Sequence, residues 1–121
     1  MIVVDDDLDI ANALKMFLLD SMPGLNVVAF ASGAEGLAFM RKTPVHLVMA
    51  DFRMPAMDGL QFLTEARVVA PNTARIMFTA YPDMILATRA LEEARIVYFF
   101  TKPLDPTNVA EVVQELLGDA S

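Results

Sequence analysis

The sequence contains no cysteine and only one histidine, His46. Without cysteine the chain cannot form disulfides, bind zinc through thiolates or use a thiol as a nucleophile. A single histidine also rules out a multi-histidine metal centre. Any metal site in this protein must therefore be built from oxygen ligands.

Long apolar runs and an excess of positive charge are also missing. No apolar run approaches the roughly 20 residues needed to cross a membrane, although 55% of the 121 residues are hydrophobic. The start, Met1 to Val4, meets three aspartates at once and lacks the basic head of a signal peptide, so we expect a cytoplasmic protein. The net charge of -7 opposes the phosphate backbone of nucleic acid. We therefore predict neither a membrane segment nor direct nucleic-acid binding.

The most informative stretch present is Leu47 to Gly59, LVMADFRMPAMDG. Its apolar start has the length and composition of a buried strand, and it ends abruptly on Asp51. Met54-Pro55 cannot continue the strand, and Asp58-Gly59 is typical of a turn into a helix. Asp51 is therefore an acidic residue at the mouth of a loop. This segment alone leaves three roles open, namely helix cap, metal ligand and nucleophile.

Apolar runs and helical periodicity alternate along the whole chain. The predicted strands are Ile2–Val4, Asn26–Ala31, His46–Ala50, Arg75–Phe78 and Ile96–Phe100. The predicted helices run over about Leu8–Met22, from Ser32 to near Thr43, from Asp58 to Ala70, from Asp83 through Leu91, and from Asp105 through Leu117. This alternation predicts one doubly wound α/β domain over residues 1–121, with a five-stranded parallel sheet covered by helices on both faces.

Polar side chains follow four of the predicted strands. They are Asp5, Asp6 and Asp7, then Asp51, Thr79 and Lys102. Ligands of such sheets bind outside the carboxyl ends of the strands, so these side chains should meet at one edge. We interpret Asp7 as the cap of the first helix and leave it out of the site.

Converging carboxylates repel one another unless a divalent cation neutralises them. An oxygen-only site with few protein ligands and room for a phosphate oxygen suits Mg²⁺ better than Ca²⁺. Lys102 supplies a point charge for a phosphoryl oxygen, and Thr79 supplies a hydroxyl donor. The set is typical of phosphoryl transfer, in which Asp51 could be the nucleophile.

At this point the chain resembles a known family, the receiver domains of two-component response regulators. The resemblance rests on Val3-Val4-Asp5-Asp6-Asp7, Asp51-Phe52-Arg53-Met54-Pro55 with Asp58-Gly59, Thr79-Ala80, and Thr101-Lys102-Pro103. It covers essentially the whole chain and implies a flavodoxin-like strand order 2-1-3-4-5. It also implies a signalling switch that is not classed as an enzyme.

The resemblance implies roles for the site residues. Asp51 would accept a phosphoryl group from the phosphohistidine of a histidine kinase or phosphotransfer protein. Asp5, Asp6, Asp51 and the Arg53 carbonyl would bind Mg²⁺, with Asp6 as the stronger direct ligand and Asp5 acting partly through water.

The same resemblance implies a switch and a partner surface. Thr79 and Phe99 would be the hydroxyl and aromatic switch pair, and Lys102-Pro103 would be a cis peptide. The last two helices and the strand between them would form a face for an output domain or a homodimer. Its exposed contributors would include Arg89, Tyr98 and Asp105.

Three features depart from the usual pattern or extend it. Many receivers have Gly-Ala before the fifth strand, whereas this chain has Glu93-Ala94-Arg95-Ile96. The segments around Thr79 and Lys102 are similar to receivers attached to HD-type phosphodiesterase or hydrogenase-regulating modules. Arg53 and Tyr81 hold positions that border the path of hydrolytic water in the family, and we expect their bulk to slow loss of the phosphate.

Two other functions stay open at the sequence level. A haloacid-dehalogenase-type phosphatase also uses a strand-tip aspartate with Mg²⁺, although Arg53 stands where its second aspartate is usual. An inert interaction module is the other alternative. The sequence also leaves open whether this is a stand-alone receiver or a piece of a longer regulator.

Overall fold

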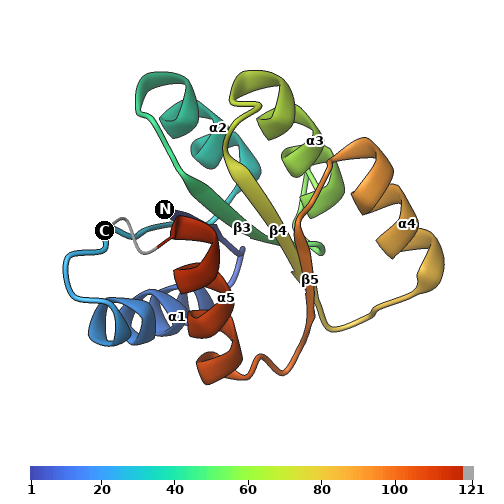
Figure 1. Cartoon of the computed structure of the whole chain (residues 1–121). Helices are drawn as coiled ribbons and strands as arrows, with labels where there is room; N and C mark the ends of the chain where they lie inside the picture. The colour runs from blue at the N-terminus through green and yellow to red at the C-terminus, as the bar shows by residue number, and fades with distance from the viewer. Residues whose placement is uncertain (119–121) are drawn as a thin grey trace.

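The computed structural model describes residues 1–118, in which strands and helices alternate from start to end (Figure 1). The strands are β1 (Ile2–Val4), β2 (Val28–Phe30), β3 (Leu47–Asp51), β4 (Ala74–Thr79) and β5 (Tyr98–Thr101). The helices are α1 (Leu8–Ser21), α2 (Gly33–Lys42), α3 (Gly59–Val69), α4 (Met84–Glu93) and α5 (Pro106–Leu117).

All strand pairs are parallel, and the sheet order is β2-β1-β3-β4-β5. The predicted doubly wound fold and its strand order are both confirmed. Val4 pairs with Ala50, and Thr79 pairs with Thr101, so the carboxyl ends of the central strands lie at one edge. The change of direction in the strand order falls between β1 and β3, which places a binding crevice at that edge.

Each face of the sheet has its own apolar core. Helices α1 and α5 cover one face, and α2, α3 and α4 cover the other (Figure 1). Phe78 and Leu18 belong to the first core, and Phe62 and Met77 to the second, and all four are fully buried. Strand β3 is buried along its whole length because it is the central strand of the sheet and helices cover both faces of the sheet.

Aspartates cap most of the helices, as their positions in the sequence predicted. Asp7, Asp58 and Asp105 accept hydrogen bonds from backbone N–H groups in the first turns of α1, α3 and α5. Asp58 forms a complete capping box with Gln61. Ser32 forms one half of a capping box, since its hydroxyl accepts a hydrogen bond from the Glu35 N–H. The same hydroxyl also donates to the Glu35 carboxylate.

The predicted strand limits were wrong at β5. The strand begins at Tyr98 rather than Ile96, because Arg95 adopts a left-handed conformation with φ of 51°. The Ile96 N–H therefore turns back to the carbonyl of Ala90 in α4, at 3.3 Å. Strand β2 is also shorter than predicted, and β4 extends further in both directions to include Ala74 and Thr79.

Candidate functional site

Lys102 connects two acidic strand tips at the carboxyl edge of the sheet. Its Nζ lies 3.3 Å from Asp5 Oδ2 and 3.3 Å from Asp51 Oδ2. Asp5 follows β1 and is 1% exposed, and Asp51 ends β3 and is 6% exposed. Three residues predicted from separate parts of the sequence therefore meet in one cluster.

Burial and charge oppose each other in this cluster. Burial raises the pKa of Asp5, and the negative charge of Asp51 raises it further, against hydrogen bonds from the Asp7 N–H and Lys102. Burial likewise raises the pKa of Asp51, although Lys102 acts in the opposite direction. Burial alone would lower the pKa of Lys102, but the two carboxylates outweigh it and the net change is upward. One lysine therefore only partly compensates the two buried acids.

Asp6 completes a group of three carboxylates. Asp5, Asp6 and Asp51 each offer an oxygen, and these oxygens all lie within 4.8 Å of one another. Asp6 is exposed, whereas the other two are buried. An oxygen-only donor set of excess negative charge, open to solvent on one side, fits a hard divalent cation such as Mg²⁺ that retains water ligands.

Gly59 sets how closely α3 approaches the end of β3. A Cβ atom at this position would lie 2.3 Å from the Asp51 carbonyl oxygen, a distance that real Cβ atoms essentially never show. The Gly59 N–H donates to the Phe52 carbonyl at 2.7 Å, which closes the intervening loop. The sequence indicated a turn here but gave no sign of this contact, which depends on three-dimensional packing.

The next strand tip brings three more predicted residues together. Thr79 is fully buried, and its Oγ1 accepts a hydrogen bond from the Tyr81 N–H at 3.1 Å. The guanidinium carbon of Arg53 lies 4.4 Å from the centroid of the Tyr81 ring. This cation–π contact joins the loop after β3 to the loop after β4.

Phe99 lies on the same face of the sheet as Thr79. Thr79 pairs with Thr101, and side chains two residues apart on a strand point to one face, which includes Phe99. Phe99 is partly buried and packs against the core beneath α2, α3 and α4. The Lys102-Pro103 peptide is cis, as predicted, and the Lys102 N–H donates to the Thr79 carbonyl at 2.8 Å.

The last two helices and β5 display the exposed residues that were predicted for them. Arg89 forms a surface ion pair with Glu93, Tyr98 is 41% exposed, and Asp105 caps α5 from an exposed position. Large apolar side chains are exposed beside them, namely Met84, Ile85, Leu91 and Val97.

Among residues 1–118, none of the helices combines the length and the apolar character that crossing a membrane requires.

Comparison with known proteins agrees with this geometry. The family model described as the response regulator receiver domain matches residues 1–114. The transcriptional regulatory protein GlrR of Escherichia coli is 34% identical over 124 residues, covering 100% of this chain and 27% of that protein. The hydrogenase transcriptional regulatory protein HoxA of Cupriavidus necator is 30% identical, covering 95% of this chain and 23% of HoxA.

Solved structures show the same fold. A CheY-like response regulator receiver domain protein from Methanospirillum hungatei has a TM-score of 0.89 at 29% identity, covering 96% of this chain and 90% of that one. The receiver domain of an HD domain-containing protein from Pseudomonas fluorescens has a TM-score of 0.88 at 27% identity, covering 96% and 91%. The chain spans about a quarter of the length of GlrR and HoxA, 27% and 23%. From its matched length and its fold, the chain belongs to the receiver domains of two-component response regulators.

Proposed function

We propose that Asp51 accepts a phosphoryl group and that Lys102 and Thr79 stabilise the phosphorylated state. The observation that carries this proposal is the position of Lys102 Nζ, 3.3 Å from both Asp5 and Asp51. A cation held there can interact with a phosphoryl oxygen as soon as Asp51 carries one. The buried Thr79 hydroxyl, at the neighbouring strand tip, is the natural hydrogen-bond donor to a second oxygen.

The chemical step is a displacement at phosphorus. A carboxylate oxygen of Asp51 forms the new O–P bond while the P–N bond of a phosphohistidine breaks, and the histidine imidazole leaves. The donor would be a histidine kinase or a phosphotransfer protein. Burial raises the pKa of Asp51, but Lys102 favours the carboxylate form that the step requires.

Asp5, Asp6 and Asp51, with the Arg53 carbonyl, are the residues that we propose would hold Mg²⁺. The ion, when bound, neutralises carboxylate and phosphoryl charge. The donor chemistry of the three carboxylates supports this assignment. We keep the prediction that Asp6 is the stronger direct ligand, since it is the exposed member of the group.

Phosphorylation would then alter the face built from α4, β5 and α5. Drawing Thr79 toward the phosphate would free space for Phe99 to turn inward, because both side chains lie on one face of the sheet. That face would contact an output domain or a second copy of the chain. The family consists of signalling switches, and we infer that this chain too is not an enzyme with a separate substrate. We also keep the predictions of a single domain over residues 1–121 and of a cytoplasmic location.

Labelling with acetyl phosphate and Mg²⁺ tests the proposal. Intact-mass measurement should show one added phosphoryl group on the wild type, and none on Asp51→Asn or in excess EDTA. Asp20→Asn, at an exposed position on α1, is the matched control and should be labelled like the wild type. Labelling of Asp51→Asn would contradict the assignment.

Assays of phosphomonoester turnover and of Mg²⁺ binding, made beside the labelling, distinguish the two other functions. Repeated turnover of a phosphomonoester would indicate a haloacid-dehalogenase-type phosphatase. Absence of both Mg²⁺ binding and labelling in the wild type would indicate an inert interaction module.

A further inference from the structure

Arg75 on β4 is a buried cation whose side-chain hydrogen bonds within residues 1–118 all go to backbone carbonyls. It is 7% exposed and forms none of the ion pairs found in residues 1–118. Its Nε donates to the Ala94 carbonyl at 2.7 Å, and its Nη2 lies 3.5 Å from the Arg95 carbonyl. Its Nη1 donates to the carbonyls of Thr73 at 2.7 Å and Pro71 at 3.3 Å. The side chain therefore joins the loop before β4 to the end of α4.

The end of α4 that Arg75 contacts is the negative end of a helix. The last carbonyls of a helix lack partners within the helix and carry partial negative charge, so a guanidinium both satisfies and stabilises them. Arg67 on α3 adds a hydrogen bond from Nη1 to the Glu93 carbonyl at 3.3 Å. Backbone also contributes, since the Val97 N–H donates to the Arg75 carbonyl at 2.8 Å. Two arginines from two different elements thus hold the C-terminal end of α4.

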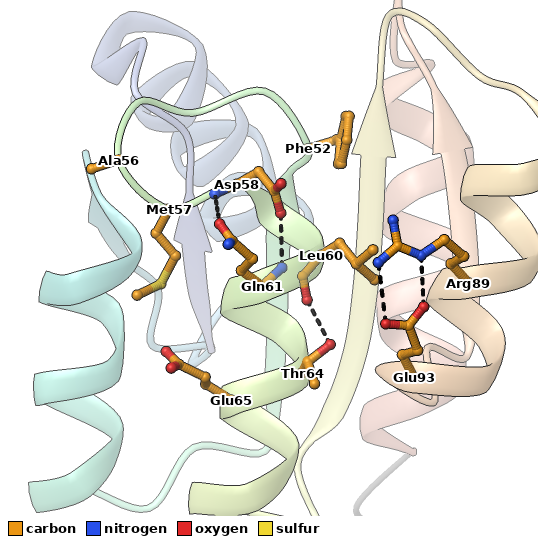
Figure 2. A pocket seen from close by; sticks show the side chains of 10 residues that line it. All are labelled: Phe52, Ala56, Met57, Asp58, Leu60, Gln61, Thr64, Glu65, Arg89 and Glu93. Carbon is orange, nitrogen blue, oxygen red and sulfur yellow. Dashed lines mark hydrogen bonds and ion pairs between the residues drawn. The ribbon is translucent and has the colours of Figure 1, made fainter.

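The N-terminal half of α4 is held much less firmly. Met84 and Ile85 are 83% and 76% exposed, and Leu86 and Ala90 are the buried residues of the helix. A groove of about 560 Å³ lies between α3 and the C-terminal half of α4, with Leu60 and Thr64 on one side and Arg89 and Glu93 on the other, and the two arginine bonds bridge beside it (Figure 2). A second hollow of about 470 Å³ extends along the first turn of α4, from Asp83 to Leu86. The exposed side chains of the first turn and the hollow along it make this part of the helix easy to displace.

We propose that Arg75 is a positioning residue that anchors the C-terminal end of α4, so that the helix responds to Asp51 by moving its N-terminal half about a fixed end. The second part of this inference rests on the proposed function. The effect of phosphorylation would reach α4 at its N-terminal end, because the fully buried Thr79 ends β4 only four residues before the Asp83 cap of α4. Arg67 supports the same anchor from α3.

Hydrogen exchange without any phosphoryl donor tests the anchor by itself. In Arg75→Met, the amides of Ala94, Ile96 and Val97 should exchange at least about tenfold faster, because the lost bonds came from a charged donor. Arg75→Lys should restore part of the protection. Glu92→Gln, which removes an exposed charge on the same helix, is the control and should exchange like the wild type. Unchanged exchange at these amides in Arg75→Met would overturn the proposal.

Arg67→Met provides an independent test if Arg75→Met does not fold. Arg67 is only partly buried, so its loss should leave the fold intact while increasing exchange at Ala94 by a smaller factor. No increase in Arg67→Met would contradict a shared anchor at this end of α4.

Exchange in the presence of acetyl phosphate and Mg²⁺ tests the movement. Phosphorylation of the wild type should alter exchange from Tyr81 to Ala87 and leave Ala94 to Val97 protected. In Arg75→Met the change should spread into the C-terminal end of α4. Equal changes at both ends in the phosphorylated wild type would overturn the fixed-end inference. If the wild type takes no phosphoryl group, the proposed function fails, whereas the measurement without donor still decides whether Arg75 is an anchor.

Discussion

Arg95 adopts a backbone conformation that favours glycine. Its φ of 51° lies in the left-handed region, which costs a residue with a Cβ atom about 1–2 kcal/mol. Its side chain is exposed, so little packing compensates the strain. This is also the segment in which the sequence departs from the Gly-Ala of many receivers. Strain in the loop between α4 and β5 is therefore intrinsic to this chain.

We expect Arg95→Gly to stabilise the protein by about 0.5–1 kcal/mol, because relief of strain exceeds the added entropy of the unfolded chain. Urea unfolding would measure the change. Arg89→Gly, in the interior of α4, is the contrasting variant and should destabilise by about 1 kcal/mol. A loss of stability in Arg95→Gly would show that its side chain has contacts that outweigh the strain.

The contact between Arg53 and Tyr81 joins the loops after β3 and β4, and we predict that these two side chains slow the loss of a phosphoryl group from Asp51. Because the guanidinium stacks on the ring, each side chain restricts the motion of the other. We expect the Arg53→Ala, Tyr81→Ala double variant to lose its phosphate several-fold faster than the wild type after the donor is removed. Tyr81→Phe keeps the ring and should stay slow. A double variant that loses phosphate no faster would refute the idea.

Residues whose chemistry is tied to a strand end could be predicted, and residues whose role depends on packing could not. Asp51 was found because it directly follows an apolar run, and Lys102 because it comes two residues after one. Arg75 was assigned only to a strand, because its partners Ala94 and Arg95 lie 19 and 20 residues further along the chain. Nothing in a local pattern encodes a side chain that reaches carbonyls so far away.

At the scale of elements, α3 approaches the end of β3 closely at Gly59, and we expect this contact to help position Asp51. We expect Gly59→Ala to destabilise the protein by about 1–3 kcal/mol, because the added methyl group must push α3 away from the Asp51 carbonyl. The same shift should slow labelling by acetyl phosphate, which a mass time course would measure.

Asp58→Ala is the control for this prediction. It removes the cap of α3 and costs about 1 kcal/mol without adding an atom next to Asp51. Equal labelling rates in the wild type and Gly59→Ala would show that the approach of α3 does not position the acceptor.

The order and type of the elements were predictable because apolar periodicity, proline and aspartate caps agree with one another along the chain. The start of β5 was not, because it depends on the left-handed Arg95 and on a bond from Ile96 to Ala90. The strand order came from the resemblance to receivers rather than from periodicity, which carries no information about which strands pair.

At the scale of the whole molecule, the buried acids make stability depend on pH. Burial raises the folded-state pKa of Asp5 and Asp51 above the ordinary value, so the folded protein binds protons more readily than the unfolded chain. Their contribution to stability is therefore fully present below the unfolded pKa and is lost as pH rises through the folded pKa. In the metal-free protein these two acids should therefore contribute less to the free energy of unfolding near neutral pH than at lower pH.

We expect metal-free Asp51→Asn to be more stable than the wild type at about pH 7, with the difference shrinking toward about pH 4. Urea unfolding in EDTA at several pH values would measure it. Adding Mg²⁺ should reverse the ranking, because an ion that binds the folded state stabilises the protein with the more complete site. If the difference in stability does not change with pH, folding does not raise the pKa of Asp51.

The pair of Lys102 and Asp5 joins residues 97 positions apart in the chain. During synthesis the acidic strand tips emerge first, and the lysine that accompanies them is among the last parts of the domain to leave the ribosome. Contacts between distant parts of a chain also form late in folding, since a long loop must close before they are made. A nascent or interrupted chain would thus expose Asp51 without its lysine, and the proposed phosphoacceptor would become competent only once nearly the whole domain has been made.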